Sequence, residues 1–266
     1  MTAVDWARET VVAFRHEPLD AAVRSSVGDL LRGVRSRWLA LRYRLGVGFS
    51  PTTCGGVAMA TTLAGVPCQF MVETQQDLRR ADTLLGEEPV LAWFIDGMVP
   101  GEVVWDVGAF HGHYSVVAAH LGAHVVAFEP VVANRQRLCR NLFHNDVAGS
   151  YAVESVGLSD RNDDRRIGAE RLPESAIGDG AEVVTVVRGD AVHRPLPDRV
   201  KVDVEGHEIA VLDGLAETLR SVSRVVVEVH DRVPPSAVRD RLHAAGLTTR
   251  VIPTGRSQTY IGGFRA

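Results

Sequence analysis

From Gly101 onward, short runs rich in β-branched residues alternate with segments of helical periodicity, and this rhythm constrains the fold more than any other feature. Strands separated by helices favour a mostly parallel, doubly wound α/β sheet with both faces covered. The last pair of strands, joined by Pro253-Thr254-Gly255, predicts a hairpin that places an antiparallel strand at one edge. The expected strands are Glu102–Val107, His124–Phe128, Tyr151–Val156, Val183–Val187, Val200–Val204, Arg224–Val229, Leu247–Ile252 and Gln258–Phe264, and the helices are 113–121, 131–145, 207–220 and 235–245.

The residues before this rhythm differ in pattern, which predicts an N-terminal extension at 1–98 and a main domain at 99–266. Within the extension, Val57–Leu63 and Pro67–Val72 flank a short turn and predict a hairpin. The remaining segments of the extension predict helices at 3–15, 19–45, 75–85 and 88–97, the last with Pro89 in its first turn.

The expected helix at 19–45 is amphipathic and basic, with six Arg against Asp29 in residues 21–50. Such a helix could make a peripheral membrane contact through 21–45. The interpretation that we favour is a helix docked on its own domain or on a homodimer partner through 1–98, because interfacial helices usually carry more Lys and bulky apolar residues.

Composition narrows the class of protein. The 266 residues are 45% hydrophobic and 23% charged, which is typical of a globular chain, and the net charge of −4 argues against a general nucleic-acid binder. No signal peptide or membrane-spanning run is apparent, and three Cys without a C-x-x-C motif suggest neither a disulfide framework nor a zinc site. We therefore expect a cytoplasmic protein.

Ligands of such sheets bind at the carboxyl ends of the strands. The first expected strand ends at Asp106 and runs into a loop containing Gly108 and Gly112. The G-x-x-x-G spacing differs from the G-x-G-x-x-G of dinucleotide enzymes, which makes an NAD-dependent oxidoreductase a weaker alternative. Glu129, at the end of the next strand, is suited to accept hydrogen bonds from the ribose hydroxyls of an adenosine cofactor.

Charged side chains occupy one face of the strand at 200–204, although a covered central strand should be apolar on both faces. The only Lys of the chain, Lys201, alternates there with valines, and Asp203 and Glu205 share its face. Glu228 and His230 repeat this pattern on the next strand, so we expect the five groups to converge. They form either a functional site, which we favour, or a buried ion-pair network with Lys201 matched to Glu228.

Several ordered motifs between about 100 and 230 resemble the FkbM family of S-adenosylmethionine-dependent methyltransferases. The resemblance implies a class I, Rossmann-like methyltransferase fold with a seven-stranded sheet. It also implies methyl transfer, usually to a hydroxyl, on a small molecule, sugar, glycan or lipid. The motifs are Asp106-Val107-Gly108-Ala109 with Gly112, Phe128-Glu129-Pro130 with Asn134, Leu138 and Asn141, Val156-Gly157-Leu158-Ser159-Asp160, Gly189-Asp190-Ala191-Val192, and Lys201-Val202-Asp203-Val204-Glu205-Gly206-His207-Glu208.

The same resemblance implies a set of contacts to S-adenosylmethionine. Glu129, followed by Pro130, would bind the ribose, and Asp203 would lie near the cofactor amino group or the reacting centre. Phe110 departs from the Asn that is common in the family, so contacts to the methionine part could differ. The methionine moiety and glycine loop would be held by Asp106, Gly108, Ala109, Gly112 and Tyr114, and the adenine would be bordered by Gly157 and Leu158.

A hydroxyl needs a general base or a metal to react at neutral pH. His230 is our first choice of base, because an imidazole is partly neutral at pH 7 without any pKa shift, and Glu205 is the second. As an alternative, Asp203, Glu205 and Glu228 could gather Mg²⁺. A non-catalytic module that binds the cofactor is the main rival to an enzyme.

Overall fold

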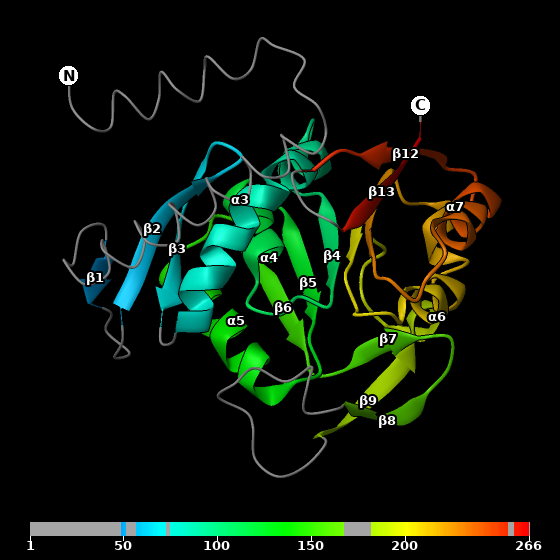
Figure 1. Ribbon diagram of the computed structural model, residues 1–266, viewed down its shortest axis with the longest axis horizontal. Helices are drawn as coiled ribbons and strands as arrows, with labels where there is room; N and C mark the ends of the chain where they lie inside the picture. The colour runs from blue at the N-terminus through cyan, green and yellow to red at the C-terminus, as the bar shows by residue number, and fades with distance from the viewer. Residues whose placement is uncertain (1–48, 52–56, 73–74, 168–181, 255–257, 266) are drawn as a thin grey trace.

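The computed structural model describes residues 49–51, 57–72, 75–167, 182–254 and 258–265. Its central sheet has seven strands in the order β12-β13-β11-β10-β4-β5-β6. Figure 1 labels β4, β5 and β6 toward one side of this sheet and β12 and β13 toward the other. All neighbouring pairs from β11 to β6 are parallel, which confirms the predicted doubly wound, mostly parallel, seven-stranded sheet. The strands are β4 Val103–Val107, β5 His124–Phe128, β6 Tyr151–Glu154, β10 Arg199–Val202, β11 Arg224–Val229, β12 Thr248–Ile252 and β13 Thr259–Phe264.

The sequence led us to expect the antiparallel strand at the edge of the sheet. That expectation is wrong, because the antiparallel strand lies inside the sheet. β13 lies between β11 and β12 and is antiparallel to both, so the edge strand β12 runs in the same direction as β11. The hairpin turns back into the sheet and pairs Tyr260 with Glu228. An aromatic residue from the end of the chain is thereby placed beside the candidate site.

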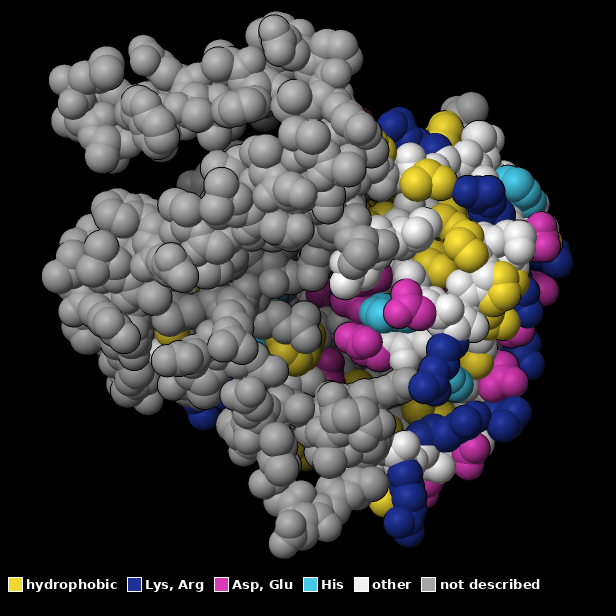
Figure 2. All heavy atoms as spheres, viewed as in Figure 1, with side chains coloured by type: hydrophobic (Ala, Val, Ile, Leu, Met, Phe, Trp, Pro, Cys, Tyr) yellow, Lys and Arg dark blue, Asp and Glu magenta, His cyan; other side chains and the backbone are white. Residues whose placement is uncertain are grey.

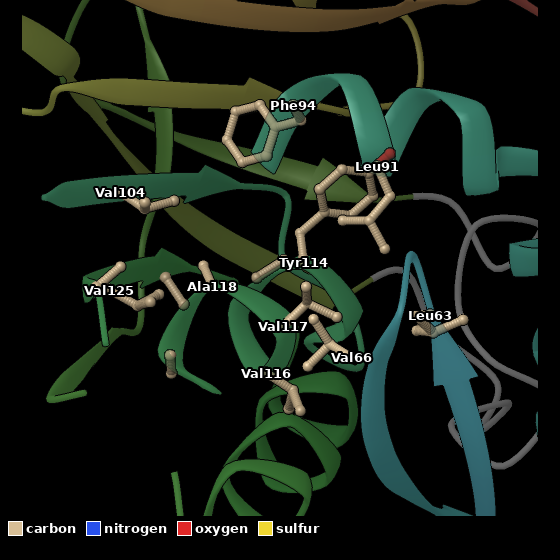
Figure 3. Packing of buried hydrophobic residues seen from close by; sticks show 14 of the residues in the cluster. Leu63, Val66, Leu91, Phe94, Val104, Tyr114, Val116, Val117, Ala118 and Val125 are labelled. Atoms are coloured by element: carbon tan, nitrogen blue, oxygen red, sulfur yellow. The ribbon is translucent and has the colours of Figure 1, made fainter. Parts of the chain in front are cut away.

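Helices cover both faces of the sheet because apolar side chains alternate along each strand. On β4, Val104 belongs to one core cluster and Trp105 to the other. The first cluster packs beneath α3 Gln75–Ile95, α4 His113–His120 and α5 Val132–His144 (Figure 3). The second packs beneath α6 Glu208–Gly214 and α7 Pro235–Ala244.

The N-terminal hairpin is confirmed. β2 Val57–Leu63 pairs with β3 Val66–Val72 across a turn at Ala64 and Gly65, and β1 Phe49–Pro51 adds to β2. The prediction of two helices at 75–85 and 88–97 is wrong, because α3 is one continuous helix with Pro89 inside it. Pro89 is exposed, and the buried Val90, Leu91 and Phe94 beside it favour continuation of the helix through packing.

A second, smaller sheet has the order β7-β9-β8, of which only β9 was predicted. The strand expected at 151–156 is shorter, since β6 ends at Glu154. The helix expected at 207–220 ends at Gly214, where an added Cβ would lie 1.8 Å from the carbonyl oxygen of Ser159, and a 3-10 turn follows at Thr218–Arg220. The strands of the second sheet are β7 Gly157–Ser159, β8 Asp163–Ile167 and β9 Glu182–Arg188.

The helices predicted at 3–15 and 19–45 lie outside the described residues, and so does the segment 21–45 for which a membrane contact was considered. Among the helices that the structure does describe, none combines the length and apolar character needed to cross a membrane. The division at residues 98 and 99 stays a prediction, although the hairpin, α3 and the sheet contribute to one core cluster.

Candidate active site

The glycine loop after β4 is shaped by close approach to protein atoms. Gly108 has φ +74°, and a Cβ there would lie 1.9 Å from the carbonyl oxygen of Asp203 at the end of β10. Gly112 has φ +83°, and its Cβ would lie 2.3 Å from Leu138 on α5. Glycine is required at Gly108, because an L side chain would meet both backbone strain and a backbone atom, whereas at Gly112 the positive φ disfavours other residues and the tip of Leu138 would have to shift.

Asp106 and Lys201 form the buried centre of the site. Asp106 is fully buried, its Oδ2 accepts hydrogen bonds from the Ser115 backbone N–H and Oγ at 3.1 and 2.6 Å, and its Oδ1 lies 3.3 Å from Lys201 Nζ. Lys201 Nζ also lies 3.5 Å from Asp203 and donates to Gly108 O. Burial lowers the pKa of Lys201, but the charges of Asp106, Asp203 and Glu228 outweigh it and raise the pKa above its usual value.

Lys201 is therefore paired with Asp106 and Asp203, and the match with Glu228 that the less favoured alternative assumed is not the contact that forms. Its ammonium also lies 5.5 Å from the ring centre of Tyr114. Tyr114 and Ala109, both predicted to hold the methionine moiety, are 6% and 4% exposed. The ring of Tyr114 packs edge-on against Phe94 in the core. Tyr114 therefore contributes to the site by packing beside Lys201.

Glu129 lies on the other side of the glycine loop. Its Oε2 accepts the backbone N–H of Phe110 at 2.8 Å, and its Oε1 accepts that of Val131 at 2.9 Å and the amide of Asn134 at 3.3 Å. Burial raises the pKa of Glu129, although these hydrogen bonds oppose the rise. A carboxylate has about four lone-pair sites, so three donors leave acceptor capacity for a hydroxyl.

Of the two residues predicted around the adenine, Gly157 lies beside Pro130 and Leu158 lies in the core. A Cβ on Gly157 would lie 3.6 Å from the ring of Pro130, which places the start of β7 beside the end of β5. Leu158 is 2% exposed, and its side chain packs in the second core cluster. The predicted contact of Leu158 with the adenine stays a prediction.

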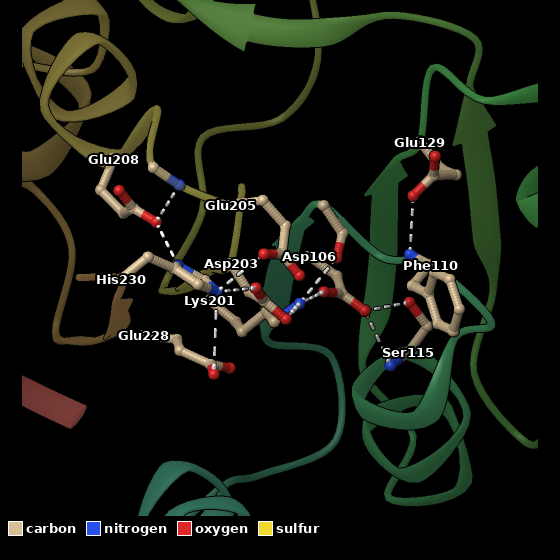
Figure 4. Close-up of polar contacts among 12 residues, drawn as sticks. Asp106, Phe110, Ser115, Glu129, Lys201, Asp203, Glu205, Glu208, Glu228 and His230 are labelled. Carbon is tan, nitrogen blue, oxygen red and sulfur yellow. Dashed lines mark hydrogen bonds and ion pairs between the residues drawn. The ribbon is translucent and has the colours of Figure 1, made fainter. Parts of the chain in front are cut away.

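His230 lies at the centre of the acidic groups, which converge as expected (Figure 4). Its Nε2 is 3.3 Å from Glu205, 3.8 Å from Asp203 and 3.9 Å from Glu228. Its Nδ1 is 2.6 Å from Glu208 Oε1. Figure 2 shows acidic and His side chains gathered on one part of the viewed face.

The assumption that His230 is partly neutral at pH 7 is wrong. Burial lowers its pKa, but the hydrogen bond to Glu208 and the charges of Glu205 and Asp203 raise it to about 9. Glu228 is raised to a pKa of about 7 by burial and by the charge of Asp203, against the opposing effect of His230 and a hydrogen bond from Tyr260. The pair therefore holds a proton that can be exchanged near neutral pH.

Sequence reasoning missed Glu208, which is 0% exposed and carries the only direct contact to His230 Nδ1 that we find among the described residues. Glu208 falls inside a motif that we recognised, but it is the first residue of α6, where an acidic residue is ordinary. Tyr260 was also missed, because no local pattern links the last strand to Glu228.

The other histidines of the strand ends make contacts within the protein. His111 is 4% exposed, between Asp77 and Arg137, and the ring of His113 packs on Phe70 at 4.5 Å. His207 Nε2 lies 3.0 Å from Ser159 Oγ, which links the loop before α6 to β7.

The clustered groups fit Mg²⁺ poorly. The ligand atoms that come within 4.8 Å of one another belong to Asp203, Glu228 and His230, so an imidazole replaces the expected Glu205. Mg²⁺ prefers oxygen ligands, and a ligating imidazole must be free of its proton, whereas His230 has a raised pKa. The cluster therefore lacks the set of oxygen ligands that Mg²⁺ prefers.

The chain is similar in sequence to a curated methyltransferase. The curated "Hexuronic acid methyltransferase AglP" of Haloferax volcanii is 31% identical over 217 residues, which cover 78% of this chain and 89% of the relative.

Solved structures with similar backbones include the FkbM methyltransferase of Methylobacillus flagellatus KT. It has 15% identity and a TM-score of 0.49, and the match covers 73% of this chain but only 56% of that one. Another is the magnesium protoporphyrin IX methyltransferase ChlM of Synechocystis PCC 6803 with bound SAH. It has 15% identity and a TM-score of 0.47 and covers 74% and 89% of the two chains.

The family model "Methyltransferase FkbM domain" matches residues 106–247. This range includes the glycine loop and the His230 cluster, which consists of His230 with Asp203, Glu205, Glu208 and Glu228. With the curated relative, this match shows that the chain belongs to the FkbM family of methyltransferases.

Proposed function

We propose that this methyltransferase takes its methyl group from S-adenosylmethionine and transfers it to an oxygen of a sugar-like acceptor. When bound, the cofactor would supply an electrophilic methyl group on a positively charged sulfur. The name of the relative from Haloferax volcanii supports a sugar acid as acceptor.

The observation that carries the proposal is the order of groups along the carboxyl ends of the strands. In Figure 4, Glu129 and the His230 cluster lie on opposite sides of Asp106 and Lys201. Glu129 would hold the adenosine part of the cofactor, and the surroundings of Asp203, where carboxylates outnumber cations, would favour its positive charge.

The acidic cluster is suited to accept the proton of the acceptor. In an in-line displacement, the acceptor oxygen bonds to the methyl carbon while the bond from that carbon to sulfur breaks. The hydroxyl proton must leave to a base, which works best with a pKa near the working pH. Glu228, with a pKa of about 7, can accept it near neutral pH, and His230, with a pKa of about 9, can accept it once its own proton has left; Glu205 lies 3.3 Å from His230 and is the second carboxylate in reach.

Calorimetry tests the cofactor. S-adenosylmethionine and S-adenosylhomocysteine are titrated into the wild type, into Glu129→Ala and into Glu217→Ala, whose exposed side chain pairs only with Arg220 in the described contacts. We expect the wild type and Glu217→Ala to bind both ligands and Glu129→Ala to lose about tenfold in affinity or more. Absence of binding to the wild type would contradict the proposal.

A labelled-methyl assay tests the acceptor. Glycosides of hexuronic acids and of matched neutral hexoses are compared, and we expect incorporation of an alkali-stable methyl ether into the acidic sugars. An alkali-labile label would place the methyl group on the carboxylate and contradict transfer to a hydroxyl. Tight cofactor binding without transfer to any sugar would favour the non-catalytic alternative.

A further inference from the structure

The carboxylate of Glu208 holds two parts of the site with one oxygen atom. Oε1 accepts the backbone N–H of Gly206 at 2.9 Å and contacts His230 Nδ1 at 2.6 Å (Figure 4). The side chain is completely buried, and Oε2 has no hydrogen-bond partner among the described residues. His230 is consequently the main counterpart of this buried charge.

The backbone next to Glu208 is strained. Glu205 has φ +52° and Gly206 has φ +95°, and a left-handed conformation is unfavourable for a Glu residue. Such a conformation persists when its surroundings hold it in place. The bond from Gly206 N–H to Glu208 does so, and the turn brings the Glu205 carboxylate to 3.3 Å from His230 Nε2.

We propose that Glu208 is a positioning residue for methyl transfer: it fixes the ring of His230 through Nδ1 and the Glu205–Gly206 turn through the backbone, so that Nε2 faces the acceptor side. This inference rests on the proposed function. Glu208 itself lies behind His230, completely buried, and acts through it.

The charges around His230 support this assignment. Asp203 and Glu205 from the loop after β10 and Glu228 from β11 all approach Nε2. Only Glu208, from α6, is found at Nδ1 among the described residues. More distant groups affect these acids in turn. Lys201 forms an ion pair with Asp203, and the pKa of Glu228 is influenced by a hydrogen bond from Tyr260 and by the charge of Glu87.

The variant Glu208→Gln separates charge from shape. Its amide oxygen can still accept the Gly206 N–H, but the negative charge beside Nδ1 is gone. We expect kcat to fall about tenfold or more while the S-adenosylmethionine Kd changes less than about twofold. The acidic limb of the kcat profile should also shift to lower pH, because a histidine that loses a carboxylate partner releases its proton more readily. Glu217→Gln, on the exposed surface, is the matched control and should leave all three quantities unchanged.

An NMR measurement on the wild type keeps the proposal testable even where Glu208→Gln does not fold. With ¹⁵N-labelled histidine, we expect His230 to be protonated at pH 7 with a strongly hydrogen-bonded Nδ1–H. An ordinary titration without that hydrogen bond would overturn the proposal, as would a folded Glu208→Gln with an unchanged pH profile. Because the NMR readout needs no cofactor, a wild type with the expected signature but no cofactor binding would refute only the proposed function.

Discussion

The ammonium of Lys201 donates a hydrogen bond to the backbone carbonyl of Gly108, with 2.7 Å between nitrogen and oxygen. The same nitrogen lies 3.3 Å from Asp106 and 3.5 Å from Asp203. One buried cation therefore joins the glycine loop after β4 to the end of β10. Through this side chain, the loop that we assign to the cofactor is in contact with the acidic cluster that we assign to the acceptor.

Replacing Lys201 by Arg should not be conservative. Three acceptors surround a compact ammonium, and a planar guanidinium cannot reproduce that geometry in a site that is 8% exposed at the side chain. We expect Lys201→Arg to lose about tenfold or more in S-adenosylmethionine affinity and to unfold at a lower temperature. Calorimetry and thermal unfolding measure the two effects.

The control is Arg220→Lys, a reverse exchange at a side chain that is 67% exposed and paired with Glu217. It should change neither quantity. If Lys201→Arg also keeps wild-type affinity and stability, the position of the only lysine is an accident.

Adding a methyl group at Gly108 should be more harmful than adding one at Gly101. Both residues have positive φ, +74° and +90°, so alanine is strained at each. At Gly101 nothing lies within 4 Å of the new Cβ, whereas at Gly108 it would meet the Asp203 carbonyl oxygen at 1.9 Å. We expect Gly101→Ala to lose about 1 kcal/mol of stability and Gly108→Ala about 2 kcal/mol more. Equal losses in chemical denaturation would show that the contact between β4 and β10 is not tight.

The mostly parallel sheet and the convergence of charged groups could be predicted, because the alternation of strands with helices favours parallel strands and parallel strands end at the same edge of the sheet. Lys201, Asp203, Glu228 and His230 are brought together as the pattern indicated. The partners of Lys201 could not be predicted. The alternation of side chains shows on which face of the sheet Lys201 lies, but only the register between strands decides which residues lie beside it. β10 pairs Lys201 with Asp106 on β4 and with Val226 on β11.

Two features of the fold were beyond local pattern. β8 begins with the charged residues Asp163, Asp164, Arg165 and Arg166, and it pairs with β9 despite that composition. The left-handed turn at Glu205 and Gly206 ends β10 earlier than the valine pattern suggested. Tertiary contacts decide both the pairing of β8 and the turn at Glu205 and Gly206. The contact of Glu208 with His230 follows from that turn.

The stability of the protein should fall as pH rises through the titration of His230. Its folded pKa of about 9 exceeds its ordinary value of 6.5, since Glu208, Glu205 and Asp203 outweigh burial, so its contribution is complete below 6.5 and is lost on approaching 9. Glu228 acts in the same direction but between 4.5 and about 7. The titration of His230 can be followed above the range in which Glu228 titrates. Between about pH 7.5 and 9.5, the difference in free energy of unfolding between the wild type and His230→Gln should shrink by about 2 kcal/mol. Urea unfolding at both pH values measures it, and a constant difference would contradict the raised pKa.

Methyl transfer should be insensitive to chelators. Asp203, Glu228 and a protonated His230 form a poor magnesium site. We expect dialysis against EDTA to leave kcat unchanged, as measured by labelled-methyl transfer. A loss of activity that added Mg²⁺ restores would show that the carboxylates bind a cation during turnover.

Removal of His230 should separate chemistry from cofactor binding. The imidazole lies among Asp203, Glu205 and Glu228, whereas Glu129 and the glycine loop lie on the other side of Lys201 (Figure 4). We expect His230→Ala to lower kcat about 100-fold or more and to change the S-adenosylmethionine Kd by less than about threefold.

In the wild type, kcat should rise with pH across the apparent pKa values of about 7 and 9, and the variant should lose the upper step. His243→Ala is the matched control, because that imidazole is exposed and contacts Thr249 Oγ1 at 2.8 Å, far from any strand end of the site. Unchanged turnover in His230→Ala would remove His230 from proton transfer and leave Glu205 and Glu228 as the candidates.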